Sequence, residues 1–359
     1  MSGSRNELVE RLFGAGVGMF DLLTIYVGDR LGCYVELRDH GPMTPRELAD
    51  ATGIHERYAR EWLEQQAASA LLDVEDTVAD QDARRYSLAS EHAEVLTDPE
   101  SPYSMAPFAR SLVAVSRATA PLLDAFRSGG GVAWEAYGQD MVEAQGDFNR
   151  PWLRASFASE YLPSIPDVHA HLSAAGARVA DIACGVGWAA ISIAQAYPEV
   201  RVDGFDPDEA SITLATKHAV EAGVDDRVTF HARDAGDRTL EGSYDLAVVV
   251  EAIHDLSRPV DVLSSVRRIL KPDGALIVAD ERTEDAFTAP ASDIERVFYG
   301  YSVLCCLPSA MDDQPSAATG TVMRRSTLEA YARDAGFAQV TVLPIEHDLI
   351  RFYRLDPEP

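Results

Sequence analysis

Residues able to bind or activate a small molecule gather in the second half of the chain, where short apolar runs end. Asp181 ends one such run and begins the segment Asp-Ile-Ala-Cys-Gly-Val-Gly, which contains Gly185 and ends at Gly187. Glycines there remove side chains, so backbone amides at the start of a following helix can approach a ligand. The segment also fits G-x-G-x-x-A, a variant of the dinucleotide fingerprint, so a nicotinamide or flavin enzyme is a competing interpretation.

Two more carboxylates follow later runs. Asp206 lies 19 residues beyond Gly187 and ends the second run, where its carboxylate could accept both hydrogen bonds of a ribose diol. Asp234, with Ala235 beside it, follows the third run and could accept a hydrogen bond from an adenine amino group. Nicotinamide enzymes have less use for an acid at that place, so Asp234 counts against the nicotinamide interpretation.

A histidine follows the fourth run, in the segment Glu-Ala-Ile-His-Asp that begins at Glu251. Imidazole is neutral near pH 7 and can take a proton from a hydroxyl group, so His254 is a candidate general base. In the alternative interpretation His254 only closes the strand and contacts a cofactor. Glu251 could approach the cofactor's amino group or support His254, while Asp255 suits the cap of the next helix.

Short β-branched runs alternate with helical segments from about residue 176 onward. This alternation predicts an α/β domain with a Rossmann-like, doubly wound and mostly parallel sheet. The strand-forming runs are 178–182, 201–205, 227–230, 245–250 and 275–279, and two last runs, 339–343 and 349–355, are expected to pair antiparallel at the sheet edge. Ligands of such sheets lie beyond the carboxyl ends of the strands, where the residues described above would meet.

The N-terminal part of the chain is mainly helical in its pattern. Apolar residues at helical spacing from about 5 to 35 predict helices, and Gly14, Gly16 and Gly18 suggest a break or a close crossing. A capping box begins at Thr44 and predicts a short helix that ends at Gly53. A second helix over about 56–70 and two runs around a polar tip, 71–74 and 85–88, complete the pattern of a winged helix.

The charge of the chain disfavours nucleic acid and anionic membranes as partners. There are 31 basic and 58 acidic side chains, which leaves a net charge of −27. In the second helix of the winged-helix pattern, Arg57 and Arg60 lie among three glutamates. This helix therefore lacks the positively charged surface that binds the phosphates of DNA. We therefore expect a dimerisation module, with a DNA-binding regulator as the alternative.

The length of the chain bears on the number of domains, and its cysteines bear on the cellular compartment. A chain of 359 residues predicts two domains, which we place at 1–125 and 166–359 with a helical connecting segment at 126–165. The four cysteines show neither a zinc-like spacing nor a disulfide framework, so no metal is expected and a reducing cytoplasm fits. The N-terminus lacks the pattern of a signal peptide, and no apolar run approaches the ~18 residues of a membrane span.

Taken in order, the motifs of the second half resemble those of class I S-adenosylmethionine-dependent methyltransferases. They are Asp-x-Ala-Cys-Gly-x-Gly, Val-Asp-Gly-Phe-Asp, Arg-Asp-Ala, Glu-Ala-Ile-His-Asp and Leu-Lys-Pro-Asp-Gly-Ala-Leu-Ile-Val, over about 176–280. The resemblance implies S-adenosylmethionine as the cofactor. Its methionine portion would be held by Asp181, Gly185 and Gly187, its ribose hydroxyls by Asp206, and its adenine by Asp234 and Ala235.

One residue departs from the family pattern. The family has glycine two residues after the motif acid, whereas this chain has Ala183. Alanine adopts a positive φ poorly, so either the backbone at Ala183 has an ordinary conformation or the methionine end of the cofactor lies slightly differently.

The segment from Glu251 onward is similar to the His-Asp-Trp-Ser segment of plant-type and polyketide O-methyltransferases, in which that histidine is the general base. Those enzymes also carry an N-terminal winged-helix dimerisation domain, so the resemblance extends over both halves of the chain. After Asp255 this chain has Leu-Ser-Arg-Pro in place of the family's Trp-Ser-Asp-Glu. The residues that orient His254 therefore need not be the same.

Substrate contacts are expected in the least patterned segments, an insertion near 281–325 and the connecting segment. The candidate residues are Trp134, Tyr137, Tyr299, Tyr301 and Met311. Cys305 and Cys306 are interpreted as core thiols, because the sequence shows no partner base for a nucleophile.

The sequence therefore predicts a homodimeric enzyme that transfers a methyl group from S-adenosylmethionine to a small-molecule hydroxyl oxygen, with His254 as the base. Transfer to nitrogen or carbon on the same scaffold is the nearest alternative. A non-methyl-transferring enzyme that binds the same cofactor, an NAD-dependent oxidoreductase and a winged-helix regulator are further alternatives.

Overall fold

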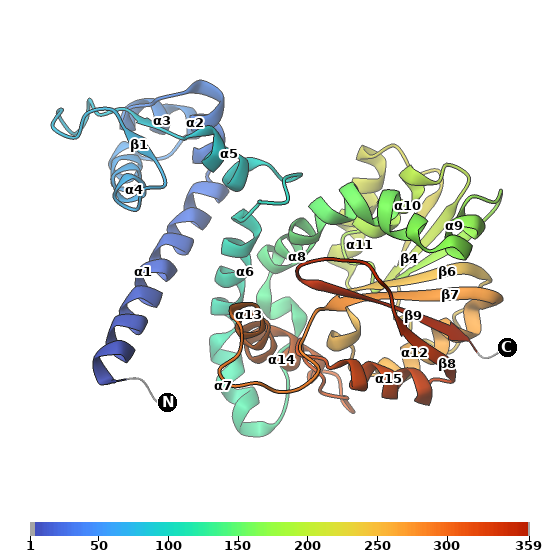
Figure 1. Cartoon of the computed structure of the whole chain (residues 1–359). Helices are drawn as coiled ribbons and strands as arrows, with labels where there is room; N and C mark the ends of the chain where they lie inside the picture. Colours follow the sequence, from blue (N-terminus) through green and yellow to red (C-terminus); the bar gives the residue numbers. More distant parts are fainter. Residues whose placement is uncertain (1–3, 358–359) are drawn as a thin grey trace. The chain divides into compact units, whose positions relative to one another are not determined.

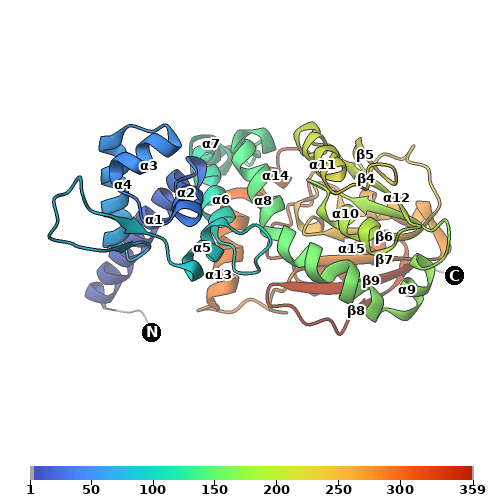
Figure 2. The same ribbon diagram turned by 90° about the horizontal axis from the view of Figure 1, so that it is seen from above.

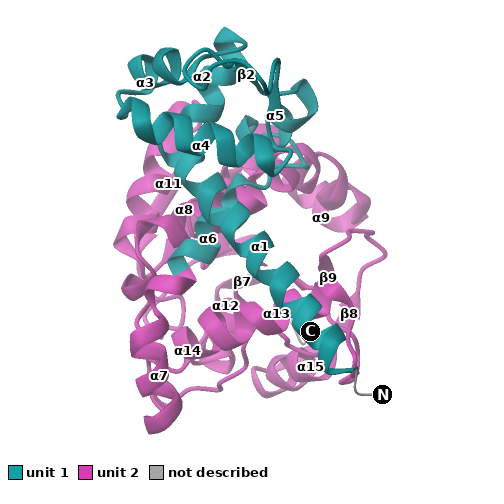
Figure 3. Cartoon of the chain, turned by 90° about the vertical axis from the view of Figure 1, so that its left-hand side faces the viewer, with its two compact units in different colours: residues 1–114 teal, residues 115–359 magenta. Residues whose placement is uncertain are grey.

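The computed structural model describes residues 4–357, which form two compact units. The units comprise residues 1–114 and 115–359 (Figure 3). The boundary lies inside helix α6 (Ala106–Arg117), earlier than the position near 125 that we expected from the sequence. The connecting segment 126–165 is consequently part of the second unit.

Helix α1 (Arg5–Arg30) opens the first unit as a single helix. The expectation of a break at Gly14, Gly16 and Gly18 is wrong, and no other part of the described chain crosses the helix closely there. The helix continues through all three positions, and a Cβ added at any of them would meet no heavy atom within 4 Å. Glycine weakens a helix by about 1 kcal/mol relative to alanine but does not end it while its backbone stays helical.

The predicted winged helix follows α1 in the chain. Helix α3 (Pro45–Thr52) begins with the capping box of Thr44 and Glu47 and ends at Gly53, and α4 (Glu56–Ala68) is the second helix. Two short antiparallel strands form the wing. The remaining elements of this part are α2 (Cys33–His40), β1 (Asp73–Val74), β2 (Tyr86–Ser87) and α5 (Ser90–Thr97).

Helices lead from α6 to the sheet of the second unit. In order they are α7 (Thr119–Ser128), η1 (Trp134–Tyr137), α8 (Gln139–Trp152), η2 (Leu153–Tyr161), η3 (Leu162–Ser164) and α9 (Pro166–Leu172). Helix α8 ends near Pro151, and η2 continues it with π-type hydrogen bonding. Proline removes a backbone donor and disturbs the regular α-helical ladder at this point.

The sheet of the second unit has seven strands in the order β5-β4-β3-β6-β7-β9-β8. The first five of this order are parallel, and β9 pairs antiparallel with both β7 and β8. The strands are β3 (Arg178–Ile182), β4 (Arg201–Asp206), β5 (Val228–Ala232), β6 (Tyr244–Val250), β7 (Leu270–Glu281), β8 (Phe337–Val342) and β9 (Ile350–Pro357). This is the predicted doubly wound sheet with an antiparallel edge.

Helices cover both faces of this sheet (Figures 1 and 2), and a core of apolar side chains lies on each face. Residues of α9, η2 and α10 (Trp188–Ala196) form the core on one face. Residues of α12 (Pro259–Ile269) and α15 (Arg325–Asp334) form the core on the other. The remaining helices are α11 (Glu209–Glu221), η4 (Ile253–Asp255), α13 (Asp293–Tyr301), η5 (Ser302–Cys306) and α14 (Leu307–Ala310).

The order of the strands places a topological switch point between β3 and β6. The chain proceeds from β3 through β4 to β5 on one side, whereas β6 and β7 extend the sheet on the other. Connections leave the two strands in opposite directions there, so a crevice opens beyond their carboxyl ends.

Among the described residues, no helix combines the length and the apolar character needed to cross a membrane.

Candidate functional site

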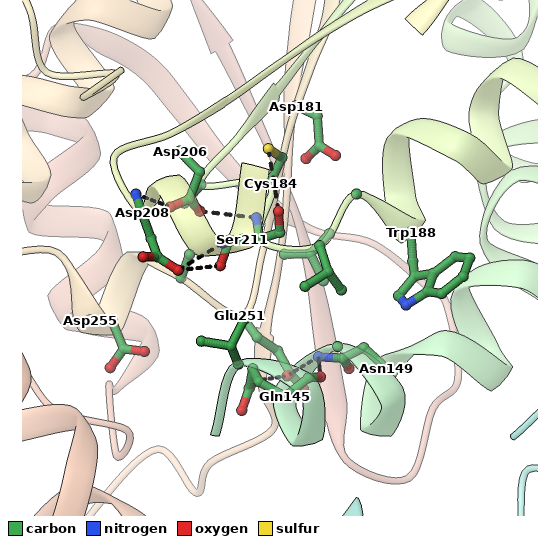
Figure 4. A pocket seen from close by; sticks show the side chains of 18 of the residues that line it. Gln145, Asn149, Asp181, Cys184, Trp188, Asp206, Asp208, Ser211, Glu251 and Asp255 are labelled. Carbon is green, nitrogen blue, oxygen red and sulfur yellow. Dashed lines mark hydrogen bonds between the residues drawn. The ribbon is translucent and has the colours of Figure 1, made fainter. Parts of the chain in front are cut away.

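A cavity of about 760 Å³ lies at this switch point, within the second unit (Figure 4). Its wall combines residues at the ends of β3, β4 and β6 with residues of α8. The wall contains seven carboxylates and no lysine or arginine: Glu135, Asp181, Asp206, Asp208, Glu209, Glu251 and Asp255. A cavity of this size suits a nucleoside cofactor, and its charge favours a cationic one.

At the end of β3, Asp181 lies in the cavity wall and is almost fully buried. Its Oδ2 accepts a hydrogen bond of 3.0 Å from the amide of Ala190, in the first turn of α10. Burial raises the pKa of Asp181 to about 7. The acid therefore ties the strand end to the helix that follows the glycine turn, in addition to facing the cavity.

The glycine turn between β3 and α10 contains three residues with a left-handed backbone, at every second position. Ala183, Gly185 and Gly187 have φ angles of +52°, +51° and +86°. Gly187 also needs the absence of a side chain, because a Cβ there would lie 2.5 Å from the ring of Phe230. An ordinary backbone conformation at Ala183, the first of the two possibilities we considered, is wrong. The turn therefore has a left-handed residue at this position, and alanine there carries strain of about 1–2 kcal/mol.

At the end of β4, Asp206 connects two structural elements. Its Oδ2 accepts from the amide of Gly185 and its Oδ1 from the amide of Asp208, both at 2.9 Å. Burial raises the pKa of Asp206 to about 6. Asp208 in turn caps α11 by accepting from the amides of Ala210 and Ser211. Asp206 thus braces the glycine turn from the neighbouring strand, and its role toward a ribose stays a prediction.

Asp234 and Ala235, which follow β5, are not among the residues that line the cavity. The Oδ1 of Asp234 accepts a 2.7 Å hydrogen bond from the amide of Gly236, and its Oδ2 lies 3.7 Å from Arg258. Asp234 therefore shapes the turn after β5 in this structure. Its contact with an adenine remains a prediction.

Glu251 follows β6 and lies in the cavity wall with a left-handed backbone, at φ +46°. Its Oε2 accepts hydrogen bonds from Gln145 Nε2 at 3.0 Å and from Asn149 Nδ2 at 2.6 Å (Figure 4). Burial raises its pKa to about 6. Strained backbone at non-glycine residues is concentrated at functional sites. The two amides on α8 were missed by sequence reasoning, because glutamine and asparagine at a four-residue spacing form no recognisable motif.

His254, in η4, is only 2% exposed and does not line the cavity, whereas its neighbour Asp255 does. Its Nδ1 lies 2.8 Å from Asp280 Oδ1 and 3.0 Å from Glu281 Oε2, and its Nε2 lies 3.4 Å from Asp255 Oδ1. Burial alone would lower the pKa of His254, but the three carboxylates together hold it well above its ordinary value. The imidazole is therefore surrounded by acids on both nitrogens.

Of the predicted substrate residues, Trp134 alone lines the cavity. The hydroxyl of Tyr137 donates to the carbonyl of Leu304 at 3.0 Å, so this buried side chain supports η5. The Tyr299 hydroxyl accepts from Arg324 at 3.1 Å. Tyr301 and Met311 are half-buried outside the cavity wall. A substrate role for these four residues is left as a prediction.

The residues of the cavity fit an S-adenosylmethionine-like cofactor. The left-handed glycine turn and the carboxylates of Asp206 and Glu251 all lie in the cavity wall, and hydroxyl and ammonium groups of such a cofactor require acceptors of this kind. A positively charged sulfur is favoured in a wall that holds only negative formal charges.

Comparison with known proteins defines the class. A family model described as a methyltransferase domain matches residues 173–315, and one described as an Rv2258c-like winged HTH domain matches residues 20–98. The chain therefore contains a methyltransferase domain and an N-terminal winged-helix domain, and the predicted fold, S-adenosylmethionine-dependent enzyme class and cofactor are confirmed.

Relatives of known activity are methyltransferases. The chain is 34% identical over 124 residues to 27-O-demethylrifamycin SV methyltransferase of Amycolatopsis mediterranei (strain S699), and this match covers 34% of the chain and 45% of that protein. It is 26% identical over 190 residues to the ubiquinone biosynthesis O-methyltransferase of Stutzerimonas stutzeri (strain A1501), which covers 52% of the chain and 76% of the relative.

Solved structures share the fold over the whole chain. Human N-acetylserotonin methyltransferase in complex with SAM has a TM-score of 0.72 at 17% identity, with all of both chains covered. The mitomycin 7-O-methyltransferase has a TM-score of 0.69 at 22% identity, with 99% of each chain covered. At these identities the likeness establishes the fold only.

Proposed function

We propose that this methyltransferase acts on a hydroxyl oxygen of a small molecule, with His254 as the general base. The observation that carries the proposal is the cavity at the switch point, which extends from the glycine turn to Asp255, the residue next to His254. The names of two relatives support oxygen as the acceptor atom. One is a 27-O-demethylrifamycin SV methyltransferase, and the other is a ubiquinone biosynthesis O-methyltransferase.

The residues of the chain have three tasks in this reaction. When bound, S-adenosylmethionine supplies a methyl group already activated by a positive sulfur, so the protein aligns the acceptor, excludes water and removes the hydroxyl proton. Glu251, held by two amides of α8, is expected to accept from the cofactor's ammonium group. Asp206, which braces the glycine turn, is expected to accept from the ribose hydroxyls.

His254 can take the proton only in its neutral form. Asp280 accepts from Nδ1–H, which leaves Nε2 as the basic nitrogen on the side of Asp255. Because the pKa of His254 is raised, the imidazolium is favoured at low pH and the base becomes available as the pH rises through that pKa. We therefore expect kcat/KM to rise with pH, over a range above the one in which an ordinary histidine titrates.

The test combines ligand binding with a variant. Calorimetry is expected to show micromolar or tighter binding of S-adenosylhomocysteine and none of NAD. His254→Ala is expected to lower kcat by about 100-fold and to leave S-adenosylhomocysteine affinity intact, whereas the control His171→Ala on α9 retains activity. Unchanged turnover and an unchanged pH profile in His254→Ala would reject the base, and mass spectra showing methylated nitrogen or carbon would reject oxygen transfer.

The proposal includes a homodimer in a reducing compartment. Helix α1 exposes apolar side chains along much of its length, with Phe13 75% and Phe20 69% exposed. Apolar surface of this kind is typical of interfaces. All four cysteines are unpaired, which suits the cytoplasm.

A further inference from the structure

Three side chains with metal-binding atoms converge beside the cavity. A ring nitrogen of His254, a carboxylate oxygen of Asp255 and the Sγ of Cys306 all lie within 4.8 Å of one another. They come from η4 and η5, which are about fifty residues apart in sequence. The thiol therefore lies next to an imidazole, although sequence reasoning treated Cys306 as a core thiol without a partner.

Two groups around the imidazole have ligand atoms close enough to hold a metal ion: His254 with Asp280 and Glu281 on the Nδ1 side, and His254 with Asp255 and Cys306 on the Nε2 side. Nδ1 lies 2.8 Å from Asp280 and 3.0 Å from Glu281, which are distances of hydrogen bonds and close ion pairs. Nε2 lies 3.4 Å from Asp255 Oδ1, which is long for a hydrogen bond. Metal–ligand bonds of about 2.1 Å in a tetrahedron separate neighbouring ligands by about 3.4 Å, so this spacing fits coordination.

The carboxylate on the Nε2 side has a free acceptor. Three buried carboxylate oxygens around His254 accept no hydrogen bond from any residue that the structure describes: Asp280 Oδ2, Glu281 Oε2 and Asp255 Oδ1, and Asp255 Oδ1 is the one beside Nε2. An unpaired buried carboxylate oxygen destabilises a fold unless a cation or a donor satisfies it. Its position points to a ligand between Asp255, His254 and Cys306.

The surroundings of His254 are those of a metal-binding histidine. Asp280 Oδ1 accepts from Nδ1–H, which fixes the ring and directs the lone pair of Nε2 toward Asp255. The backbone is also fixed, because the carbonyl of His254 accepts from the amide of Gly320. Cys306 ends a π-helical turn that Tyr137 supports through Leu304, and such turns are frequent at functional sites.

A cation could reach these residues from the cavity. Asp255 lines the cavity and its side chain is 35% exposed, whereas Asp280 on the other side of the imidazole is 1% exposed. A third ligand from the thiol favours a thiophilic ion over Mg²⁺ or Ca²⁺.

We propose that His254, Asp255 and Cys306 form a site for a thiophilic divalent cation of the Zn²⁺ type, with its fourth position open to the cavity. On binding, the bond between sulfur and the cation replaces the S–H bond of Cys306, and the imidazolium of His254 gives up its Nε2 proton, so both protons are released to solvent. Nε2 coordinates with its lone pair in the neutral imidazole. Because the same lone pair is the base of the proposed reaction, the cation is expected to inhibit methyl transfer. Only this inhibition depends on the proposed function.

The experiment measures binding of Zn²⁺ itself to the full chain after removal of metal with a chelator. Equilibrium dialysis with elemental analysis is expected to give one Zn²⁺ per chain, and Co²⁺ is expected to give a near-ultraviolet thiolate charge-transfer band. Cys306→Ser should weaken Zn²⁺ binding by at least about tenfold and remove that band. Cys305→Ser is the matched control, because Cys305 is the adjacent, buried thiol outside the group and should bind as the parent does.

Two results would overturn the proposal: absence of binding in the parent protein, and equal binding in Cys306→Ser. In the second case, loss of binding in Asp280→Asn would place the ion on the Nδ1 side. Unchanged circular dichroism and S-adenosylhomocysteine affinity establish that each variant is folded. Zn²⁺ binding through Cys306 in a protein that transfers no methyl group would reject the proposed function and leave the site intact.

Discussion

Ala183 holds a left-handed backbone in the glycine turn, at φ +52°, where the family has glycine. Ala183→Gly removes strain of about 1–2 kcal/mol from the folded state and gives back about 0.4–1 kcal/mol through a more flexible unfolded chain. We therefore expect the free energy of unfolding to rise by about 0.5–1 kcal/mol in urea titrations. Ala330→Gly, inside α15, is the control and should lower it by about 1 kcal/mol. A loss of stability in Ala183→Gly would show that the alanine methyl packs favourably.

Residue identity could predict much of the site, but residue conformation could not. The acids at strand ends were found because each follows a short apolar run, and Asp181, Asp206 and Glu251 do line one cavity. The left-handed conformation of Ala183 was not predicted, because alanine itself disfavours it. The cluster around His254 was also not predicted. In the sequence, Asp280 only follows a strand pattern, and Cys306 belongs to an apolar helical pattern.

At the scale of elements, patterns with a local cause could be predicted from the sequence. The capping box at Thr44 and the five parallel strands depend on neighbouring residues, and the structure has both. Helix α1 shows the limit of such reasoning, because three glycines did not outweigh the many helix-forming residues around them. Contacts between α8 and the end of β6 depend on tertiary packing alone.

That contact between α8 and β6 gives a prediction for cofactor binding. Asn149→Leu removes the 2.6 Å hydrogen bond to Glu251, so the buried carboxylate loses its shorter donor and becomes easier to protonate. A less ionised and less fixed Glu251 should weaken S-adenosylhomocysteine binding by about tenfold, which is about 1.4 kcal/mol by calorimetry. Gln139→Leu, at an exposed position of the same helix, should bind as the parent does. Equal affinities in both variants would leave Glu251 without a role in binding.

At the scale of the whole molecule, the proposed dimer must form between two chains of net charge −27 each. The α1 residues Val9, Phe13 and Phe20 are 60%, 75% and 69% exposed, and their spacing places them along one face of the helix. An association driven by apolar contact and opposed by like charges should tighten as salt screens the repulsion, in contrast to one based on ion pairs.

Sedimentation equilibrium between about 0.05 and 0.5 M salt is therefore expected to show a dimer whose dissociation constant falls as salt rises. Phe13→Glu combined with Phe20→Glu removes apolar area and adds charge of the same sign, so this variant should be largely monomeric. Val78→Glu is the matched control, because Val78 is 89% exposed but lies in the polar tip between β1 and β2. A dimer that persists in the double variant, or that weakens with added salt, would exclude the apolar face of α1 as the main contact.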